Sequence, residues 1–235
     1  MRTILIEIYI DCEMMMKPYD LPLFPLNTVL FPGMPLHLHM FEARYKQMID
    51  LCIQESQPFG VVLIRKGMEA LGPLAESHAT GTMARIVQVE KLAQGRMNIL
   101  TVGTDRFRVL KFDSSRTPYL VGSVEPFPLE SQDEEGLALT GASLRVHLLG
   151  YLENLAKISD IVFDPRQIPL EPVELCYLCA IALQIPEASK QEILEVPGAP
   201  ELIEFLQACL RREQALMNVL SERHKMKAIG SFSSN

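Results

Sequence analysis

An acidic, proline-containing segment divides this chain of 235 residues into two parts with different side-chain patterns. The segment 125–136 (EPFPLESQDEEG) holds five acidic residues, two prolines and no basic residue. Prolines interrupt helices and sheet ladders, and clustered like charges resist packing, so we place a domain boundary there. Residues 1–128 carry 13 basic and 13 acidic side chains, whereas residues 129–235 carry 9 and 16, so the net charge of −7 lies entirely in the second part.

The first part has the side-chain pattern of short β-strands. Apolar and polar residues alternate in Leu36–Met40, and Phe59–Ile64 is a continuous apolar run of the kind found in buried strands. A single helix interrupts them, because apolar residues recur at helical spacing between Phe41 and Cys52. Further strand-like stretches are 81–92, which a turn at Gln94-Gly95 joins to 97–102, then 107–112 and 119–127. Six or seven short strands separated by turns predict a small barrel or sandwich rather than alternating β-α-β units.

The second part has the side-chain pattern of helices. Apolar residues from Leu144 to Leu155 form one stripe, and Pro172 stands where the first turn of a helix tolerates proline. The sequence that follows, VELCYLCAIALQI, is apolar on nearly all sides and predicts a central, buried helix. Two more helices are expected over 187–196 and from Pro200 onward. Four helices predict a bundle, so the chain as a whole is expected to be α+β.

The first 13 residues, MRTILIEIYIDCE, need a separate interpretation. Their isoleucines alternate as in a strand, and Glu7 interrupts the apolar run that a secretory signal needs. No small-residue cleavage site follows, so we do not expect export. Three methionines occupy positions 14–16, and we hypothesise that synthesis begins at one of them. An N-terminal peptide containing Ile4, found by mass spectrometry, would contradict that hypothesis.

Two residue patterns are associated with redox or metal chemistry, and for both we favour a structural role. Cys176 and Cys179 form a Cys-x-x-Cys pair, but the pair lies inside the apolar helix, where free cysteines pack as small hydrophobic residues. His37 and His39 share one face of a strand. A metal site would need a third ligand, and none is evident nearby in the sequence; only folding could bring Glu42, His78 or His147 close. We expect no metal and no cofactor.

The run LPLFPLNTVLFPGMPLHLHMFEARYKQMI, residues 21–49, resembles the opening signature of the Lon protease N-terminal domain family. That signature combines a Leu-Pro-Leu-Phe-Pro strand, a Leu-Phe-Pro-Gly turn and a Phe-Glu-x-Arg-Tyr helix start. Further matches follow in the same order, at 59–63 (FGVVL), 81–86 (GTMARI), Gly95-Arg96 and 103–109 (GTDRFRV). Five ordered matches between residues 21 and 109 make the resemblance specific, whereas any one alone is weak.

The resemblance implies a PUA-like β pseudo-barrel followed by a C-terminal helical bundle. We accordingly assign residues 1–19 to an N-terminal extension, 20–128 to the β domain, 129–136 to an acidic linker and 137–235 to the bundle. Lon proteases continue into an ATPase and a Ser-Lys peptidase, yet this chain has no G-x-x-x-x-G-K-[ST] phosphate-binding motif and is too short for the peptidase. We therefore expect a stand-alone member of the family.

The first part supplies the residues expected to bind peptide. Phe31, Pro32, Met34 and Pro35 form an apolar loop, which is either a docking surface or a plug for the end of the barrel. Glu42 and Arg44 open the first helix, where the carboxylate complements the helix dipole and the arginine offers forked donors to a peptide carbonyl or carboxylate. Arg106 and Arg108 share a strand face, whose simpler role is a solvated edge. The expected peptide-binding set is Phe31, Pro32, Met34, Pro35, Glu42, Arg44, Tyr45 and Arg106.

The expected function is binding of unfolded or degron-like polypeptides without catalysis. No Gly-x-Ser-x-Gly, His-Glu-x-x-His or Ser-x-x-Lys motif occurs in the chain. A related role is that of an adaptor that supplies substrates to a separate ATP-dependent protease. The alternative is an RNA-associated module, because PUA-like barrels in other families bind RNA. An acidic chain without tryptophan has neither a basic stripe nor the strongest stacking residue, which disfavours RNA.

The location expected for the chain is the cytoplasm. Five cysteines are an odd number and belong to no short secreted framework, so reduced thiols are the simplest interpretation. No run of 18 apolar residues without a charge occurs, so we expect no membrane-spanning segment.

Overall fold

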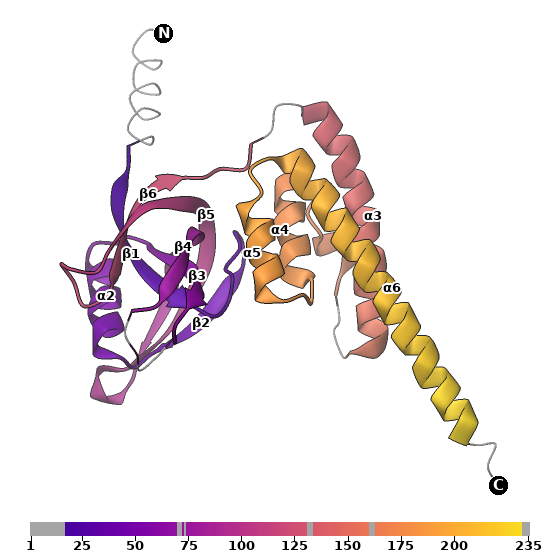
Figure 1. Ribbon diagram of the computed structural model, residues 1–235, viewed down its shortest axis with the longest axis horizontal. Helices are drawn as coiled ribbons and strands as arrows, with labels where there is room; N and C mark the ends of the chain where they lie inside the picture. Colours follow the sequence, from indigo (N-terminus) through magenta and orange to yellow (C-terminus); the bar gives the residue numbers. More distant parts are fainter. Residues whose placement is uncertain (1–16, 70–71, 73, 131–133, 160–162, 232–235) are drawn as a thin grey trace. The chain divides into compact units, whose positions relative to one another are not determined.

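The computed structural model describes residues 17–231, except for 70–71, 73, 131–133 and 160–162 (Figure 1). The strand-like pattern of residues 1–13 and the methionines at 14–16 lie outside these described residues. The chain divides into two compact units. The first comprises residues up to 128 together with 185–195, and the second comprises 129–184 together with the residues from 196 onward.

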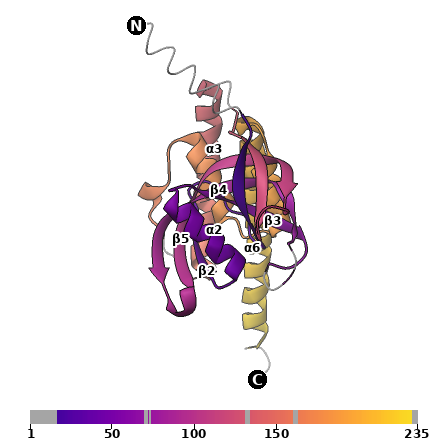
Figure 2. The same ribbon diagram turned by 90° about the vertical axis from the view of Figure 1, so that its left-hand side faces the viewer.

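The first unit is built around one six-stranded sheet within the described residues. Its strands are β1 (Tyr19–Leu26), β2 (Pro35–Met40), β3 (Phe59–Lys66), β4 (Glu76–Lys91), β5 (Met97–Asp113) and β6 (Leu120–Pro126). The strand order is β2-β5-β4-β3-β1-β6, and β6 also pairs with β5, so that five strands close into a barrel and β2 extends it as an edge strand. Among the described strands of the sheet, β1 and β3 are the parallel pair, because β2 and helix α2 (Ala43–Gln54) lie between them in the chain. Figure 2 shows α2 beside the strands of the first unit.

Strand β5 has different neighbours along its two halves. Its first half, Met97–Val102, pairs with β2, and its residues from Phe107 onward pair with β6. The side-chain pattern predicts two strands, 97–102 and 107–112, whereas the structure has one continuous strand. The hairpin that joins β4 to β5 turns at Gln94 and Gly95, which have φ angles of 62° and 66°. Those left-handed conformations confirm the predicted turn.

Helix α2 packs its apolar stripe onto the barrel core. Its buried side chains are Tyr45, Met48, Ile49 and Cys52, as the spacing predicted. The ring of Phe24 from β1 meets Tyr45 edge to face, with ring centroids 4.3 Å apart. Phe41 does not belong to the stripe, because it precedes the helix and is 45% exposed.

Helix α5 (Glu187–Glu195) packs against the barrel of the first unit. The Glu187 carboxylate accepts a hydrogen bond from the Val29 amide at 2.7 Å, and Gln191 Nε2 donates to the Thr80 carbonyl at 3.1 Å. Residues 185–195 therefore belong with the strands and not with the helical bundle, where the sequence analysis placed them. These two hydrogen bonds join residues more than 100 positions apart, so no local pattern indicates them.

The second unit is helical. Within the described residues it contains α3 (Glu134–Ile158), α4 (Pro172–Ala182) and α6 (Ala199–Ser231). Helix α4 begins at Pro172 as predicted, and the Glu171 carboxylate caps it by accepting from the Glu174 amide at 2.6 Å. Its cysteines, Cys176 and Cys179, are fully buried, which confirms their packing role.

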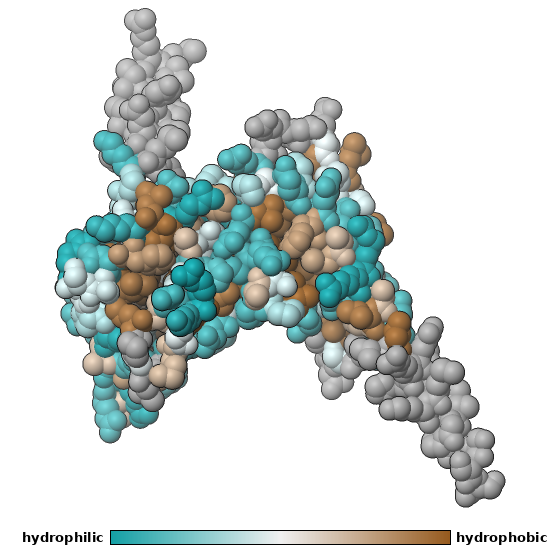
Figure 3. All heavy atoms as spheres, in the orientation of Figure 1, coloured by the Kyte–Doolittle hydropathy of each residue, from teal (hydrophilic) through white to brown (hydrophobic). Residues whose placement is uncertain are grey.

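The surface of the chain mixes polar and apolar side chains. Figure 3 shows apolar residues gathered in bands between hydrophilic ones on the face drawn there. Among the residues that the structure describes, no helix combines the length and the apolar character needed to cross a membrane.

Candidate functional site

Strands β2 and β4 each have an edge without a pairing partner in the described part of the chain. Strand β2 pairs with β5 on one side only, along its whole length. Strand β4 extends past the start of β3, where Phe59 pairs with Ala84, so its remaining residues also present one free edge. Unpaired strand edges are templates for the addition of another strand.

The edge of β2 is the more regular template. Along β4 the register with β5 shifts between Ile86 and Gln88, and charged residues such as Arg85 and Glu90 occupy the strand. Bulges and charges are the features by which natural proteins discourage strand addition. Strand β2 keeps an unbroken register from Pro35 to Met40 and contains no lysine, arginine or carboxylate.

The ladder between β2 and β5 determines which main-chain groups face the open side. The Gly103 amide donates to the Met34 carbonyl at 3.0 Å, and the Thr101 hydroxyl reaches the Leu36 carbonyl at 3.1 Å, so both carbonyls face β5. In an antiparallel ladder every second residue bonds to the partner strand. The alternate residues, His37 and His39, therefore direct their N–H and C=O groups away from β5.

A groove of about 270 Å³ runs along this open edge. Phe24, Leu26, Leu38 and Tyr45 give it apolar walls. Burial raises the pKa of Tyr45, so the phenol stays neutral in the physiological range. The other residues around the groove are His37, His39, Met40, Phe41, Glu42 and Glu69. Its volume lies just below the roughly 300–1,000 Å³ of small-molecule sites, a size that suits single side chains.

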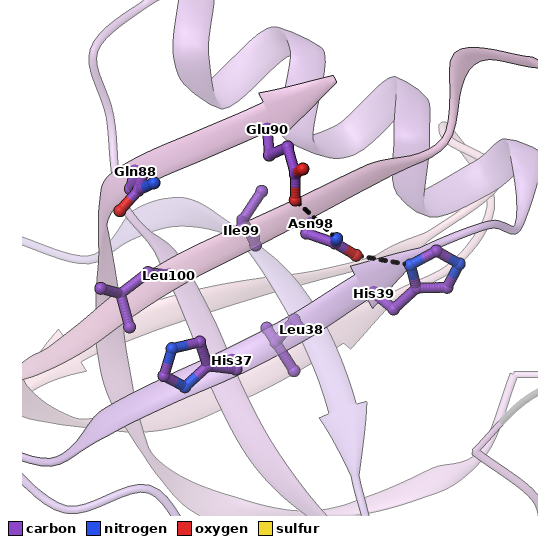
Figure 4. Close-up of a pocket in the computed structure, with 8 residues that line it drawn as sticks. All are labelled: His37, Leu38, His39, Gln88, Glu90, Asn98, Ile99 and Leu100. Atoms are coloured by element: carbon purple, nitrogen blue, oxygen red, sulfur yellow. Dashed lines mark hydrogen bonds between the residues drawn. The ribbon is translucent and has the colours of Figure 1, made fainter. Parts of the chain in front are cut away.

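A second hollow of about 430 Å³ lies on the outer face of β2, β5 and β4 (Figure 4). There His39 Nδ1 lies 2.7 Å from Asn98 Oδ1, and Asn98 Nδ2 donates to Glu90 Oε2 at 2.8 Å. Because a carboxylate only accepts, the amide nitrogen must face Glu90 and the amide oxygen must face His39. The Nδ1 atom of His39 therefore carries a proton that it donates to Asn98.

The groove includes two residues of the expected peptide-binding set, Glu42 and Tyr45. Pro35 starts the edge strand and is exposed. The guanidinium group of Arg44 already has partners within the chain. Its Nη2 lies 2.9 Å from the Glu42 carboxylate, and its Nη1 donates to the Gly72 carbonyl at 3.2 Å. Pro32 and Met34 are partly buried in the preceding loop, and Met34 packs against the core.

Two further residues of that set are buried and do not line the groove. Phe31 is 1% exposed, so its ring closes the barrel as the plug interpretation expects. Arg106 is 2% exposed and donates to the carbonyls of Phe127 and Leu194, so it serves packing and is removed from the candidate site. Exposed Arg108 lies over the Phe127 ring, 4.2 Å from its centroid.

The sequence did not indicate the residues on and beside β2 as a binding surface. His37 and His39 were considered only as metal ligands, and Leu38, Phe41, Glu69, Asn98 and Glu90 were not singled out. The uncharged, alternating sequence PLHLHM was the available signal. No group of three or more histidine, cysteine or acidic residues in the described part of the chain is arranged to hold a metal ion. His78 instead lies 3.4 Å from Glu195, and His147 bonds to the Ser143 carbonyl.

The fold and the groove define an α+β barrel protein with one regular strand edge open beside an apolar hollow. A family model described as the ATP-dependent protease La (LON) substrate-binding domain matches residues 20–212. The chain belongs to this family.

Curated relatives and solved structures agree with this assignment. The Lon protease of Anaeromyxobacter dehalogenans is 26% identical over 208 residues, and Lon protease 2 of Sorangium cellulosum is 29% identical over 215. The alignments cover 86% and 88% of this chain but 24% and 26% of those proteins, so the chain spans about a quarter of their length.

Two solved Lon domains share the fold. The Lon N-terminal domain protein from Xanthomonas campestris aligns with a TM-score of 0.58 at 27% identity, covering 81% of this chain and 98% of the other. The N-terminal domain of the Mycobacterium avium complex Lon protease aligns at 0.63 with 20% identity, covering 82% and 98%, which establishes likeness of fold alone.

Proposed function

We propose that this chain is a polypeptide-binding module that takes up extended segments as an additional strand along β2. The observation that carries the proposal is the regular, uncharged and unpaired edge of β2 beside an apolar groove. Strand addition derives affinity from main-chain hydrogen bonds and specificity from pockets for alternate side chains. His37 and His39 supply the main-chain hydrogen-bonding groups, and the groove beside β2 accepts an apolar side chain of the bound segment.

Family membership supports this reading, because the family model is described as a substrate-binding domain and the curated relatives are proteases. We extend the proposal to unfolded or degron-like polypeptides as ligands and to a role without catalysis.

In that role the chain acts in the cytoplasm as an adaptor or recognition factor in protein quality control. Co-purification with an ATP-dependent protease tests the adaptor role, and recovery of the chain free of any protease contradicts it.

A proline scan of β2 tests strand addition directly. Proline at position 37 removes only an N–H that faces the open side, and edge strands tolerate proline there. We expect His37→Pro to weaken binding of a fluorescent extended peptide at least tenfold, because one main-chain bond and the approach of the peptide are lost. His37→Ala is the matched control and is expected to bind within about threefold of the unaltered chain, since a main-chain N–H remains. Equal affinity of both variants contradicts strand addition.

Binding of RNA is the competing function, and one observation favours it: the rings of His39 and Phe41 are stacked, with centroids 5.9 Å apart. Such a platform suits a nucleobase. The carboxylates of Glu42, Glu69 and Glu90 surround it and would repel phosphates. A salt-dependent gel shift with single-stranded RNA would support the competitor over the peptide.

A further inference from the structure

We infer that the edge of β2 selects segments in which an apolar residue is followed or preceded directly by arginine. This inference rests on the proposed function, and it concerns which extended polypeptides the groove prefers. The selection comes from the stacked rings of His39 and Phe41 and from three carboxylates. Glu90 lines the hollow on the outer face, and Glu42 and Glu69 line the groove.

Successive side chains along a strand face opposite sides of the sheet, so β2 has inward-facing and outward-facing side chains. Leu38 faces inward and packs against the core, whereas its neighbours His37 and His39 face outward. A strand added beside β2 alternates in the same way. Its residue level with Leu38 therefore enters the apolar groove, and the residue on either side of it lies against an outward-facing histidine.

The outward side of the edge offers a stacking surface. His39 and Phe41 are stacked at an interplanar angle of 23°, and 45% of the Phe41 side chain is exposed. A planar guanidinium stacks on such a ring and is attracted by its face. Lysine has a compact ammonium and lacks the planar group, so arginine fits this surface better.

Hydrogen-bond acceptors and charge point to the same partner. The Asn98–Glu90 pair orients the His39 ring, because the Asn98 oxygen accepts from Nδ1 while the amide nitrogen donates to Glu90. Three carboxylates, Glu42, Glu69 and Glu90, border the two hollows. Among the described residues that line these hollows there is no lysine or arginine, although Arg44 stands behind Glu42 as its ion-pair partner. An arginine arriving on the added strand meets acceptors and net negative charge.

Matched peptides test the inference. The probe is an eight-residue extended peptide with one central leucine, flanked on one side by arginine, by citrulline or by glutamate. Citrulline keeps the planar shape of arginine without its charge. We expect the arginine peptide to bind about three- to tenfold tighter than the citrulline peptide and the glutamate peptide to bind most weakly. The ratio of arginine to citrulline affinity should shrink at high salt, because exposed charges are screened.

Variants of the chain identify the surface responsible. Glu90→Gln is expected to bring the arginine-to-citrulline ratio toward one while the citrulline affinity changes little. Phe41→Ala removes a stacking ring, so it is expected to weaken both peptides and the arginine peptide more, which also lowers the ratio. Leu110→Ala, at an exposed position on β5 outside both hollows, is the control and should leave the ratio unchanged. Equal binding of the arginine and citrulline peptides overturns this inference and leaves strand addition standing. Failure of all three peptides to bind, with the fold intact, overturns the proposed function itself.

Discussion

Arg106 donates a hydrogen bond from Nη1 to the main-chain carbonyl of Leu194, 2.9 Å away and 88 positions further along the chain. Its Nε donates to the carbonyl of Phe127 at 3.1 Å, and its guanidinium lies 4.5 Å from the centroid of the Phe127 ring. Buried charges persist in proteins when they are hydrogen-bonded, so this arginine fastens both α5 and the segment after β6 to strand β5. A residue that the sequence suggested for peptide binding thus stabilises the first unit.

Replacement of this arginine should be costly. Arg106→Met keeps a similar length but leaves two buried carbonyls without their donor, so we expect a loss of about 3 kcal/mol in the free energy of unfolding. Denaturation with urea, followed by circular dichroism, measures it. Arg108→Met is the matched control, because exposed Arg108 only covers the Phe127 ring, and its loss should stay below about 1 kcal/mol. Comparable losses for the two variants would show that Arg106 has no special role.

Gly103 should tolerate no side chain. A Cβ there would press on the main-chain oxygen of Phe31, which cannot move without displacing the loop that plugs the barrel. We expect Gly103→Ala to lower the free energy of unfolding by about 2–3 kcal/mol. Gly33→Ala provides the comparison: Gly33 has open space around it but a φ of 79°, so only about 1 kcal/mol of backbone strain is expected. The reverse ranking in thermal melts would contradict the steric account.

Thiol labelling should separate the cysteines by burial. Cys52, Cys176 and Cys179 are buried, whereas Cys209 is partly exposed. In a Cys12→Ser background at pH 8, iodoacetamide is expected to modify Cys209 first and the other three only on unfolding. Peptide mapping by mass spectrometry reads out the sites. Rapid modification of Cys176 or Cys179 in the folded chain would revive a redox role for the Cys-x-x-Cys pair.

The same burial predicts a loss of stability in alkali. Desolvation raises the pKa of Cys52 to about 11 and that of Cys176 to about 12, and it raises the pKa of Cys179 further. In the unfolded chain these thiols ionise near pH 8.5, so ionisation favours unfolding above that pH. The contribution of these thiols to the free energy of unfolding should be level up to about pH 8 and fall from there to about pH 12, the pKa of Cys176 in the folded chain. Cys176→Ala should flatten the fall, and an unchanged slope in that variant would contradict this origin.

Several motif residues turn out to have packing roles. A Cβ at Gly81 would meet the Val61 carbonyl oxygen and the Phe107 ring, and the Thr82 hydroxyl donates to the Leu30 carbonyl at 2.6 Å. These are the Gly-Thr positions on which the resemblance to the Lon N-terminal domain family rested. These residues hold the strands and the plugging loop together, so this motif is a sign of the fold. They do not line the groove along β2.

The sequence alone determined the features that depend on neighbours a few positions apart. Side-chain periodicity located α2 and its buried stripe, the turn at Gln94 and Gly95, and the start of α4 at Pro172, because each reflects local geometry. Tertiary structure decided the rest. In the folded chain Arg106 is buried, α5 packs on the barrel, and β2 has an unpaired edge among the described residues. Each of these depends on contacts between residues far apart in the chain, which the spacing of residues does not indicate. The value of an alternating, uncharged strand as a site depends on whether another strand covers it, and only the folded sheet decides that.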